Sequence, residues 1–199
     1  PLFISTPHVK VVSVVDGAIA PQRHERRPAE TRKILAATGK KNLVAFSTRN
    51  ICHLGHEHLH TISLEVMDIL GVFVITGAGV KGNFLPDVIF DTYEHLLENY
   101  YPEDKLFLNN LRLPPFFAGP KEAYLQAAVL QNHGFNHFIV GRDHAGIGGY
   151  YDKYAAQKIF DEFSSLDIDI MRVSEQRYCN VCRKITTERS CRHGIGDVA

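Results

Sequence analysis

Short apolar runs alternate with longer amphipathic stretches along most of the chain. The longer stretches repeat their apolar residues at the three-to-four-residue spacing of a helix, and the short runs have the length of buried strands. Strands and helices that alternate with short links predict an α/β protein with a doubly wound parallel sheet, covered by helices on both faces. The predicted strands are residues 43–46, 72–76, 105–109, 137–141 and 168–173, and the predicted helices are 28–38, 56–70, 87–100, 121–132 and 151–163.

The helix predicted over 56–70 is the longest of these. We expect its apolar face to be buried against the sheet. In doubly wound sheets ligands bind beyond the carboxyl ends of the strands, so the residues that follow each strand are the first place to look for chemistry. The apolar residues that recur on one face of this helix are Leu59, Ile62, Val66, Ile69 and Leu70.

The two ends of the chain differ from this regular middle. Residues 9–15 alternate weakly, as a strand would, and the polar, proline-bounded residues 21–28 suggest a linker. The predicted organisation is an N-terminal extension or linker at 1–40, a catalytic domain at 41–175 and a zinc-binding segment at 176–199.

Composition narrows the class of protein. Of 199 residues, 45% are hydrophobic and 22% are charged, with 22 basic and 22 acidic side chains, which excludes a disordered chain and argues against a surface for nucleic acid. The longest apolar run, 69–75, is too short to span a membrane, and the first ten residues lack the pattern of a signal peptide. We therefore expect a cytoplasmic protein with no nucleic-acid or membrane partner, and homo-oligomer formation stays open.

A histidine-rich motif, STRNICHLGHE, follows the first predicted strand at residues 47–57. His53 and His56 are three residues apart, so at the start of a helix both imidazoles face one spot, where free backbone N–H groups favour an anion. Arg49 adds a permanent charge that can form two hydrogen bonds with an oxyanion. The motif predicts a polyphosphate site, and a surface helix that is merely rich in histidine is the alternative.

A glycine-rich motif, GRDHAG, follows the fourth predicted strand at residues 141–146. Its glycines let backbone N–H groups approach an anion closely, while Arg142 and His144 supply charge and hydrogen bonds. The alternative is an ordinary turn with a surface ion pair between Arg142 and Asp143.

Three of the four cysteines lie near the C-terminus, in the spacing Cys179-x2-Cys182-x8-Cys191-x-His193. Three thiolates and one imidazole suit a closed tetrahedral zinc site, which has no open position for catalysis. The single residue before His193 is a short spacing, so the identity of the fourth ligand stays open, and three free buried thiols are the alternative. Cys52, inside the histidine-rich motif, is interpreted as a packing residue.

Together, STRNICHLGH and GRDHAG resemble the signatures of the sulfate adenylyltransferase (ATP sulfurylase) family, Gln-Thr-Arg-Asn-Pro-x-His-x-x-His and Gly-Arg-Asp-His-Ala-Gly. The resemblance extends through RPAETR and AGPKEA and covers roughly residues 27–193. It implies the catalytic domain of that family, with a Rossmann-like nucleotidyltransferase fold. The implied reaction joins ATP, carried with Mg²⁺, and sulfate to give adenosine 5′-phosphosulfate and pyrophosphate. A structural Zn²⁺ in the C-terminal segment is implied as well.

The resemblance also assigns roles to single residues. His53 and His56 match histidines that stabilise the phosphates during transfer, and Arg49 matches an arginine that helps to hold sulfate. Asn50 and Arg142 complete the implied catalytic set. The residues with implied ATP- or anion-binding roles are Thr48, Lys81, Gly141, Asp143, His144, Ala145 and Gly146.

Departures from the family pattern concern several polar groups on the acceptor side. Each lost charge-assisted contact costs on the order of 1.5–3 kcal/mol, so two or three losses would weaken sulfate binding. Two alternatives to sulfate activation therefore stay open: the same transfer to another oxyanion or phosphorylated acceptor, and a nucleotide-binding module without catalysis. The differing positions are Ser47 (glutamine in the family), Asn83 (aspartate), Ile89 (a basic residue) and Phe116 (arginine).

Overall fold

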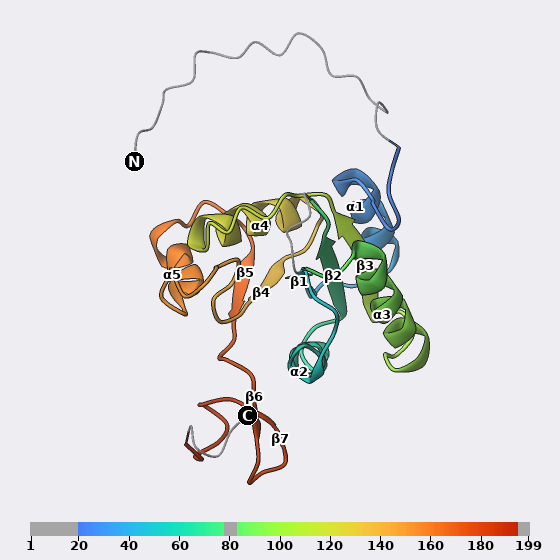
Figure 1. Cartoon of the computed structure of the whole chain (residues 1–199). Helices are drawn as coiled ribbons and strands as arrows, with labels where there is room; N and C mark the ends of the chain where they lie inside the picture. The colour runs from blue at the N-terminus through green and yellow to red at the C-terminus, as the bar shows by residue number, and fades with distance from the viewer. Residues whose placement is uncertain (1–19, 78–82, 195–199) are drawn as a thin grey trace, which may run out of the picture.

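The fold is built on one five-stranded parallel sheet, seen in a computed structural model that describes residues 20–77 and 83–194. The strands are β1 (Leu43–Thr48), β2 (Ile69–Ile75), β3 (Leu106–Leu111), β4 (His137–Val140) and β5 (Asp169–Arg172). Their order across the sheet is β3-β2-β1-β4-β5 (Figure 1). The chain runs outward from β1 to β3 and then returns to the other side of β1. Ligands of doubly wound sheets bind where the order reverses, here between β1 and β4.

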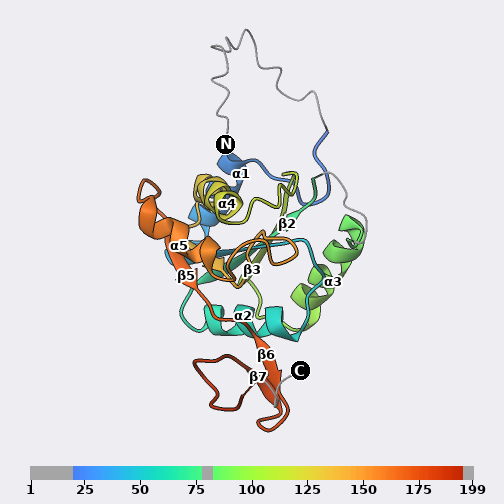
Figure 2. The same cartoon turned by 60° about the vertical axis from the view of Figure 1, so that its left-hand side comes forward.

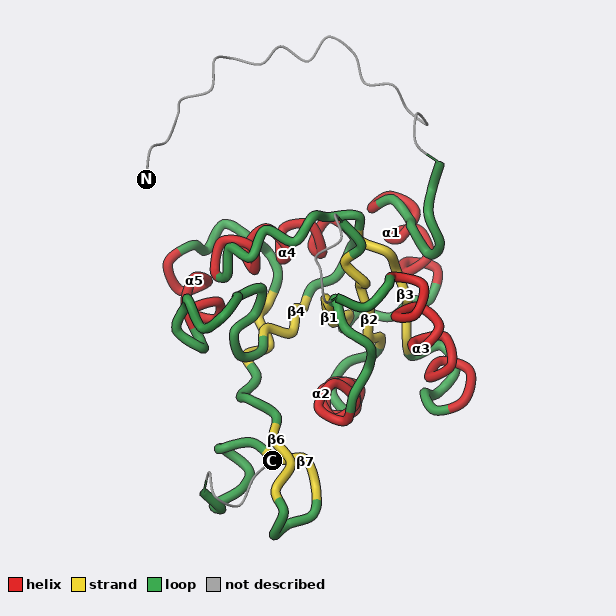
Figure 3. The backbone as a smooth tube through the Cα atoms, viewed as in Figure 1, coloured by secondary structure: helices red, strands yellow, loops and turns green. Residues whose placement is uncertain are grey.

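Helices cover both faces of the sheet (Figure 3). They are α1 (Pro28–Ala37), α2 (Leu54–Leu64), α3 (Pro86–Asn99), α4 (Pro120–Asn132) and α5 (Ala155–Glu162). Leu35 of α1, Leu130 of α4 and Ala156 of α5 belong to one core cluster, whereas Leu59 of α2 and Phe90 of α3 belong to the other. The central strands β1, β2 and β4 are thus buried on both faces, and the sheet confirms the predicted α/β class with parallel strands.

The prediction of one helix over residues 56–70 is wrong for the second half of that range. Helix α2 ends at Leu64, Ile69 and Leu70 begin β2, and Val66 is 62% exposed. The apolar spacing fits a helix, but Ile69 pairs with Leu43 of β1. That backbone pairing is a contact between distant parts of the chain, which the local pattern does not contain.

Three smaller elements differ from the prediction. Helix α5 starts at Ala155, after a turn in which the Asp152 carboxylate accepts the N–H of Tyr154 at 3.0 Å. The short strands β6 (Arg177–Cys179) and β7 (Lys184–Thr186) pair antiparallel in the cysteine-rich segment and were not predicted. Figures 1 and 2 both place this pair beyond α2, on the side away from α4.

Three sequence-based expectations are not decided by this fold. The strand expected at 9–15 and Lys81 lie outside the described residues. The division of the chain at residues 40 and 175 stays a prediction.

Among the helices of the described ranges, none combines the length and the apolar character that crossing a bilayer requires.

Candidate active site

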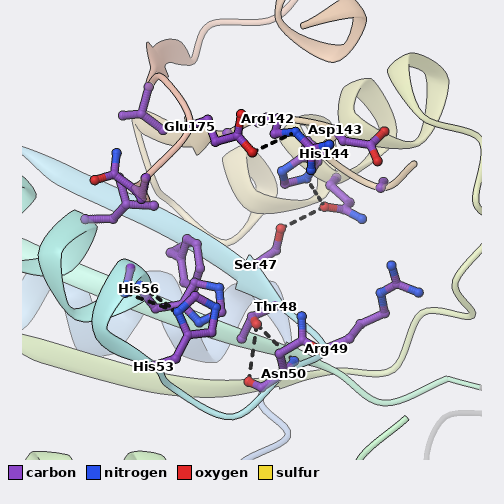
Figure 4. Close-up of a pocket in the computed structure, with 18 of the residues that line it drawn as sticks. Ser47, Thr48, Arg49, Asn50, His53, His56, Arg142, Asp143, His144 and Glu175 are labelled. Carbon is purple, nitrogen blue, oxygen red and sulfur yellow. Dashed lines mark hydrogen bonds and ion pairs between the residues drawn. The ribbon is translucent and has the colours of Figure 1, made fainter. Parts of the chain in front are cut away.

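A cavity of about 420 Å³ opens at the carboxyl ends of β1, β4 and β5, at the reversal point of the sheet (Figure 4). Residues 47–50 line it from the end of β1, residues 141–145 from the loop after β4, and residues 173–176 from the segment after β5. The structure thus brings the two motifs together across one space. The predicted site residues that line this cavity are Thr48, Arg49, Asn50, His53, His56, Gly141, Arg142, Asp143, His144 and Ala145.

Gly146 and Lys81 are the predicted ATP- or anion-binding residues that are not found in this lining. Lys81 lies outside the described part of the chain. Gly146 donates its N–H to the carbonyl of Asp143 at 3.0 Å, and a Cβ at this position would lie 1.9 Å from Asp143 Oδ1. Glycine is therefore needed for the shape of the turn, in which Asp143 and Ala145 both have positive φ.

His53 caps the N-terminus of α2 with its own ring. Its Nδ1 accepts the N–H groups of Gly55 at 3.1 Å and of His56 at 3.4 Å. The cap occupies two of the N–H groups that were expected to be free for an anion, and anion binding at this end of the helix stays a prediction. Since Nδ1 accepts, the proton of neutral His53 sits on Nε2, which remains a donor for a ligand.

Three histidines form a column along α2 that leads from the cavity into the core. The rings of His53 and His56 stack with centroids 3.8 Å apart, and the His60 ring lies 6.4 Å beyond. Burial, and then the neighbouring His53, lower the pKa of His56 to about 4. His60 is fully buried, and its Nδ1 lies 2.8 Å from the Tyr101 hydroxyl. Burial is also the main reason why the pKa of His60 falls to about 3.

Acidification is expected to destabilise the chain through buried His60. The pKa of His60 rises from about 3 in the folded chain to about 6.5 in the unfolded chain, so below pH 6.5 the unfolded state binds the extra proton. The stability from neutral His60 is fully present above about pH 6.5 and is lost as the pH falls toward 3, with ~2 kcal/mol lost by about pH 5. Urea unfolding at neutral and acidic pH measures this loss. The variant His60→Gln should lack this acid-induced loss of stability, whereas His58→Gln should keep it. Equal pH dependence of stability in both variants would contradict the assignment of the loss to His60.

The two arginines of the cavity are held by weak, reversible contacts. Arg142 Nε lies 3.1 Å from Glu175 Oε1, with both side chains nearly half exposed. The Arg49 guanidinium lies 4.5 Å from the centre of the Phe117 ring. An exposed ion pair contributes little free energy, so a more highly charged anion can displace Glu175 from Arg142. The arrangement can therefore gather two guanidinium groups and the His53 Nε2–H around a polyphosphate.

His144 belongs to a buried polar network that the sequence analysis missed. Its Nε2 lies 2.8 Å from Gln126 Oε1, which also accepts the Ser47 hydroxyl at 2.7 Å. Burial, and then the charge of Arg49, lower the pKa of His144 to about 4. Gln126 could have been noticed, because it is a polar residue on the apolar face of α4, between Ala123 and Leu130. Glu175, outside both motifs, gave no such signal.

The residues that depart from the family pattern differ in their burial and in whether they line the cavity. Ser47 lines the cavity, but its hydroxyl donates to Gln126. Ile89 is 2% exposed and packs in the core under α3. Phe116 is 53% exposed and is not among the lining residues of the cavity. Of these three positions, Ser47 alone contacts the cavity.

The cysteine-rich segment gathers four metal-ligand side chains. The Sγ atoms of Cys179, Cys182 and Cys191 and the Nδ1 of His193 all lie within 4.8 Å of one another, and Sγ of Cys191 is 3.7 Å from each of the other two Sγ atoms. A tetrahedral zinc with bonds of about 2.3 Å to sulfur holds its thiolates about 3.8 Å apart. The donor set and its spacing therefore fit zinc.

Cys52 stands apart from this cluster. Burial raises the pKa of its thiol to about 11, so the thiolate is disfavoured near neutral pH. This agrees with its interpretation as a packing residue, and partly buried Cys52 packs against the core cluster on the α2 and α3 side of the sheet.

Comparison with known proteins gives a consistent result along most of the chain. The model of the ATP-sulfurylase family matches residues 22–198. Sulfate adenylyltransferase from Pyrococcus abyssi is 42% identical over 171 residues, which cover 86% of this chain and 45% of that protein. Sulfate adenylyltransferase from Carboxydothermus hydrogenoformans is 44% identical over 170 residues, which cover 84% of this chain and 44% of that protein. The chain thus spans less than half the length of these curated relatives.

Among solved structures, the hexameric APS kinase from Thiobacillus denitrificans superposes with a TM-score of 0.62 at 18% identity. The match covers 86% of this chain and 32% of that chain. At this identity the likeness concerns the fold alone, and it agrees with the parallel α/β architecture.

Proposed function

The chain belongs to the ATP-sulfurylase family, and from this membership we propose that it joins ATP and sulfate into adenosine 5′-phosphosulfate with release of pyrophosphate. The observation that carries the proposal is the convergence of both signature motifs on one cavity at the reversal point of the sheet. We place the reaction in the cytoplasm, where ATP is available and thiols stay reduced.

The reaction needs positioning and charge rather than a covalent intermediate. A sulfate oxygen attacks the α-phosphorus of ATP in line, a new oxygen–phosphorus bond forms, and the bond from the α-phosphorus to the bridging oxygen of pyrophosphate breaks. Arg49 holds sulfate, while Arg142 and the Nε2–H of His53 neutralise charge that develops on the phosphates. Neutral His56 packs against His53 and fixes the orientation of its ring.

The residues present also fit the two metals of the proposal. Asp143 Oδ1 is buried and has no hydrogen-bond partner within the described residues, which suits a carboxylate that contacts hydrated Mg²⁺ carried by ATP. Bound Mg²⁺ supplies charge neutralisation at the phosphates. Cys179, Cys182, Cys191 and His193 would hold a structural Zn²⁺, which stabilises the fold of the C-terminal segment.

A different acceptor is the second candidate. The observation that favours it is the Ser47 hydroxyl, which donates to Gln126 instead of facing an acceptor. Sulfate would then be held chiefly by Arg49, and a larger oxyanion or a phosphorylated acceptor could use the same cavity.

An acceptor screen tests the proposal. We expect the chain to release pyrophosphate from ATP and Mg²⁺ when sulfate is added and not without an acceptor, because the attacking oxygen comes from sulfate. Pyrophosphate release is measured with sulfate, selenate, molybdate, a phosphorylated small molecule and no addition. Release with another acceptor but not with sulfate would show that the other compound is the acceptor. ATP binding without release under any condition would favour a non-catalytic nucleotide-binding module.

A further inference from the structure

Gln126 occupies a position between the two motifs although it belongs to neither. Its side chain is 1% exposed on α4, and it lies in the wall of the cavity. Its Oε1 meets two groups, the Ser47 hydroxyl at 2.7 Å and the His144 Nε2 at 2.8 Å. Its Nε2 lies 3.2 Å from Oε1 of Glu122, one turn earlier on the same helix. Figure 4 shows the bonds from Ser47 and His144 converging on one amide oxygen.

The orientation of the Gln126 amide is fixed by its neighbours. Glu122 is 3% exposed, and its other oxygen accepts the backbone N–H of Ala118 at 3.1 Å. A carboxylate only accepts hydrogen bonds, so the side of Gln126 that faces Glu122 must be the NH₂ group. The carbonyl of Gln126 therefore faces Ser47 and His144, and both of those groups must donate to it.

The same reasoning fixes the protonation of His144. A carbonyl oxygen cannot donate, so the nitrogen of His144 that meets it carries the proton. In a neutral imidazole only one nitrogen is protonated, so Nδ1 then carries a lone pair. Burial lowers the pKa of His144 to about 4, which keeps the ring neutral without a ligand at neutral pH.

We infer that Gln126 is a positioning residue that holds His144 as the Nε2–H tautomer, with Nδ1 left as a hydrogen-bond acceptor. His144 is among the residues that line the cavity, so the bond to Gln126 also fixes how its ring is presented there. The inference deepens the proposed function and rests on it for the ligand that this cavity would hold.

The tautomer is measured directly by ¹⁵N NMR of histidine-labelled chain without ligand at neutral pH, with His144→Asn used to assign the signals. We expect a protonated Nε2 and an unprotonated Nδ1 in the parent. Gln126→Met keeps the volume and removes the acceptor, so His144 should shift toward a mixture of tautomers. Gln131→Met is the matched control on the same helix, since Gln131 bonds the backbone of Asp167 instead, and it should leave the His144 signals unchanged.

An Nδ1–H tautomer in the parent overturns the inference even if Gln126→Met does not fold. Parent-like His144 signals in a folded Gln126→Met overturn it as well. Ser47→Ala removes the other donor to the same carbonyl and should preserve the tautomer; its loss there would assign the positioning to Ser47.

Binding of ATP and of inorganic pyrophosphate separates this inference from the proposed function. Failure of both to bind would count against the proposed function, while the measurement without ligand still decides the tautomer.

Discussion

His53→Asn is expected to lower sulfate-dependent pyrophosphate release by about 100- to 1,000-fold while the chain keeps nearly its full stability. His53→Ala should lose the same activity and, in addition, about 1 kcal/mol of stability. The two variants differ because His53 has two separate tasks. Its Nδ1 caps helix α2, and its Nε2–H is free to donate to a phosphate.

The physical basis lies in the size of the replacement side chains. Asparagine is among the best N-cap residues, so its amide oxygen can accept the N–H groups that His53 Nδ1 accepts now. Its side chain is too short to place a donor where Nε2–H lies. Alanine provides neither the cap nor the donor, so it loses both contributions.

The measurement combines turnover with urea unfolding for both variants. His58→Asn is the matched control, because His58 is on the same helix and is not among the residues that line the cavity; its turnover should stay near the parent value. Near-normal turnover in His53→Asn would show that His53 does not contribute to phosphate binding or transfer. Equal stability loss in the asparagine and alanine variants would show that the cap is not what the ring contributes.

The central strands β1, β2 and β4 could be predicted because they are short, mostly apolar and buried on both sides. Phe73 belongs to the core cluster on one face and Val72 to that on the other, so neither face of β2 needs polar residues. The end of α2 could not be predicted in the same way. Ile69 and Leu70 continue the helical spacing of Leu59 and Ile62, and only the pairing of Ile69 with Leu43 makes them a strand.

The same difference between local and distant contacts explains which residues of the candidate site could be predicted. His53, Arg49 and Arg142 were found because each belongs to a contiguous motif at the end of a strand. Gln126 was missed because its partner Ser47 is 79 positions away in the sequence. The cap made by His53 was also missed, because which ring nitrogen accepts depends on the backbone geometry at the start of α2.

The purified chain is expected to contain about one zinc ion, and Cys179→Ala should lose it together with the folded C-terminal segment. Strands β6 and β7 have three residues each, and an isolated two-stranded hairpin is marginal in water even when it is longer. Among the four side chains that would hold the zinc, Cys179 alone is fully buried, so its loss removes the most enclosed of the proposed bonds. Metal content is measured by mass spectrometry after extensive dialysis, and Cys52→Ala is the matched control that should keep the zinc.

Loss of zinc should also weaken ATP binding, although no zinc ligand lines the cavity. Ser174, Glu175 and Gln176 form one wall of the cavity and lead directly into β6. The Tyr154 hydroxyl accepts the N–H of Glu175 and donates to Glu188, so it ties this wall to the cysteine-rich segment. When the segment unfolds, Glu188 is released and the Tyr154 hydroxyl, which accepts from the wall, loses its own acceptor. A folded Cys179→Ala chain with full zinc content would refute the site, and a zinc-free chain with unchanged ATP affinity would refute the coupling while leaving the structural role of zinc intact.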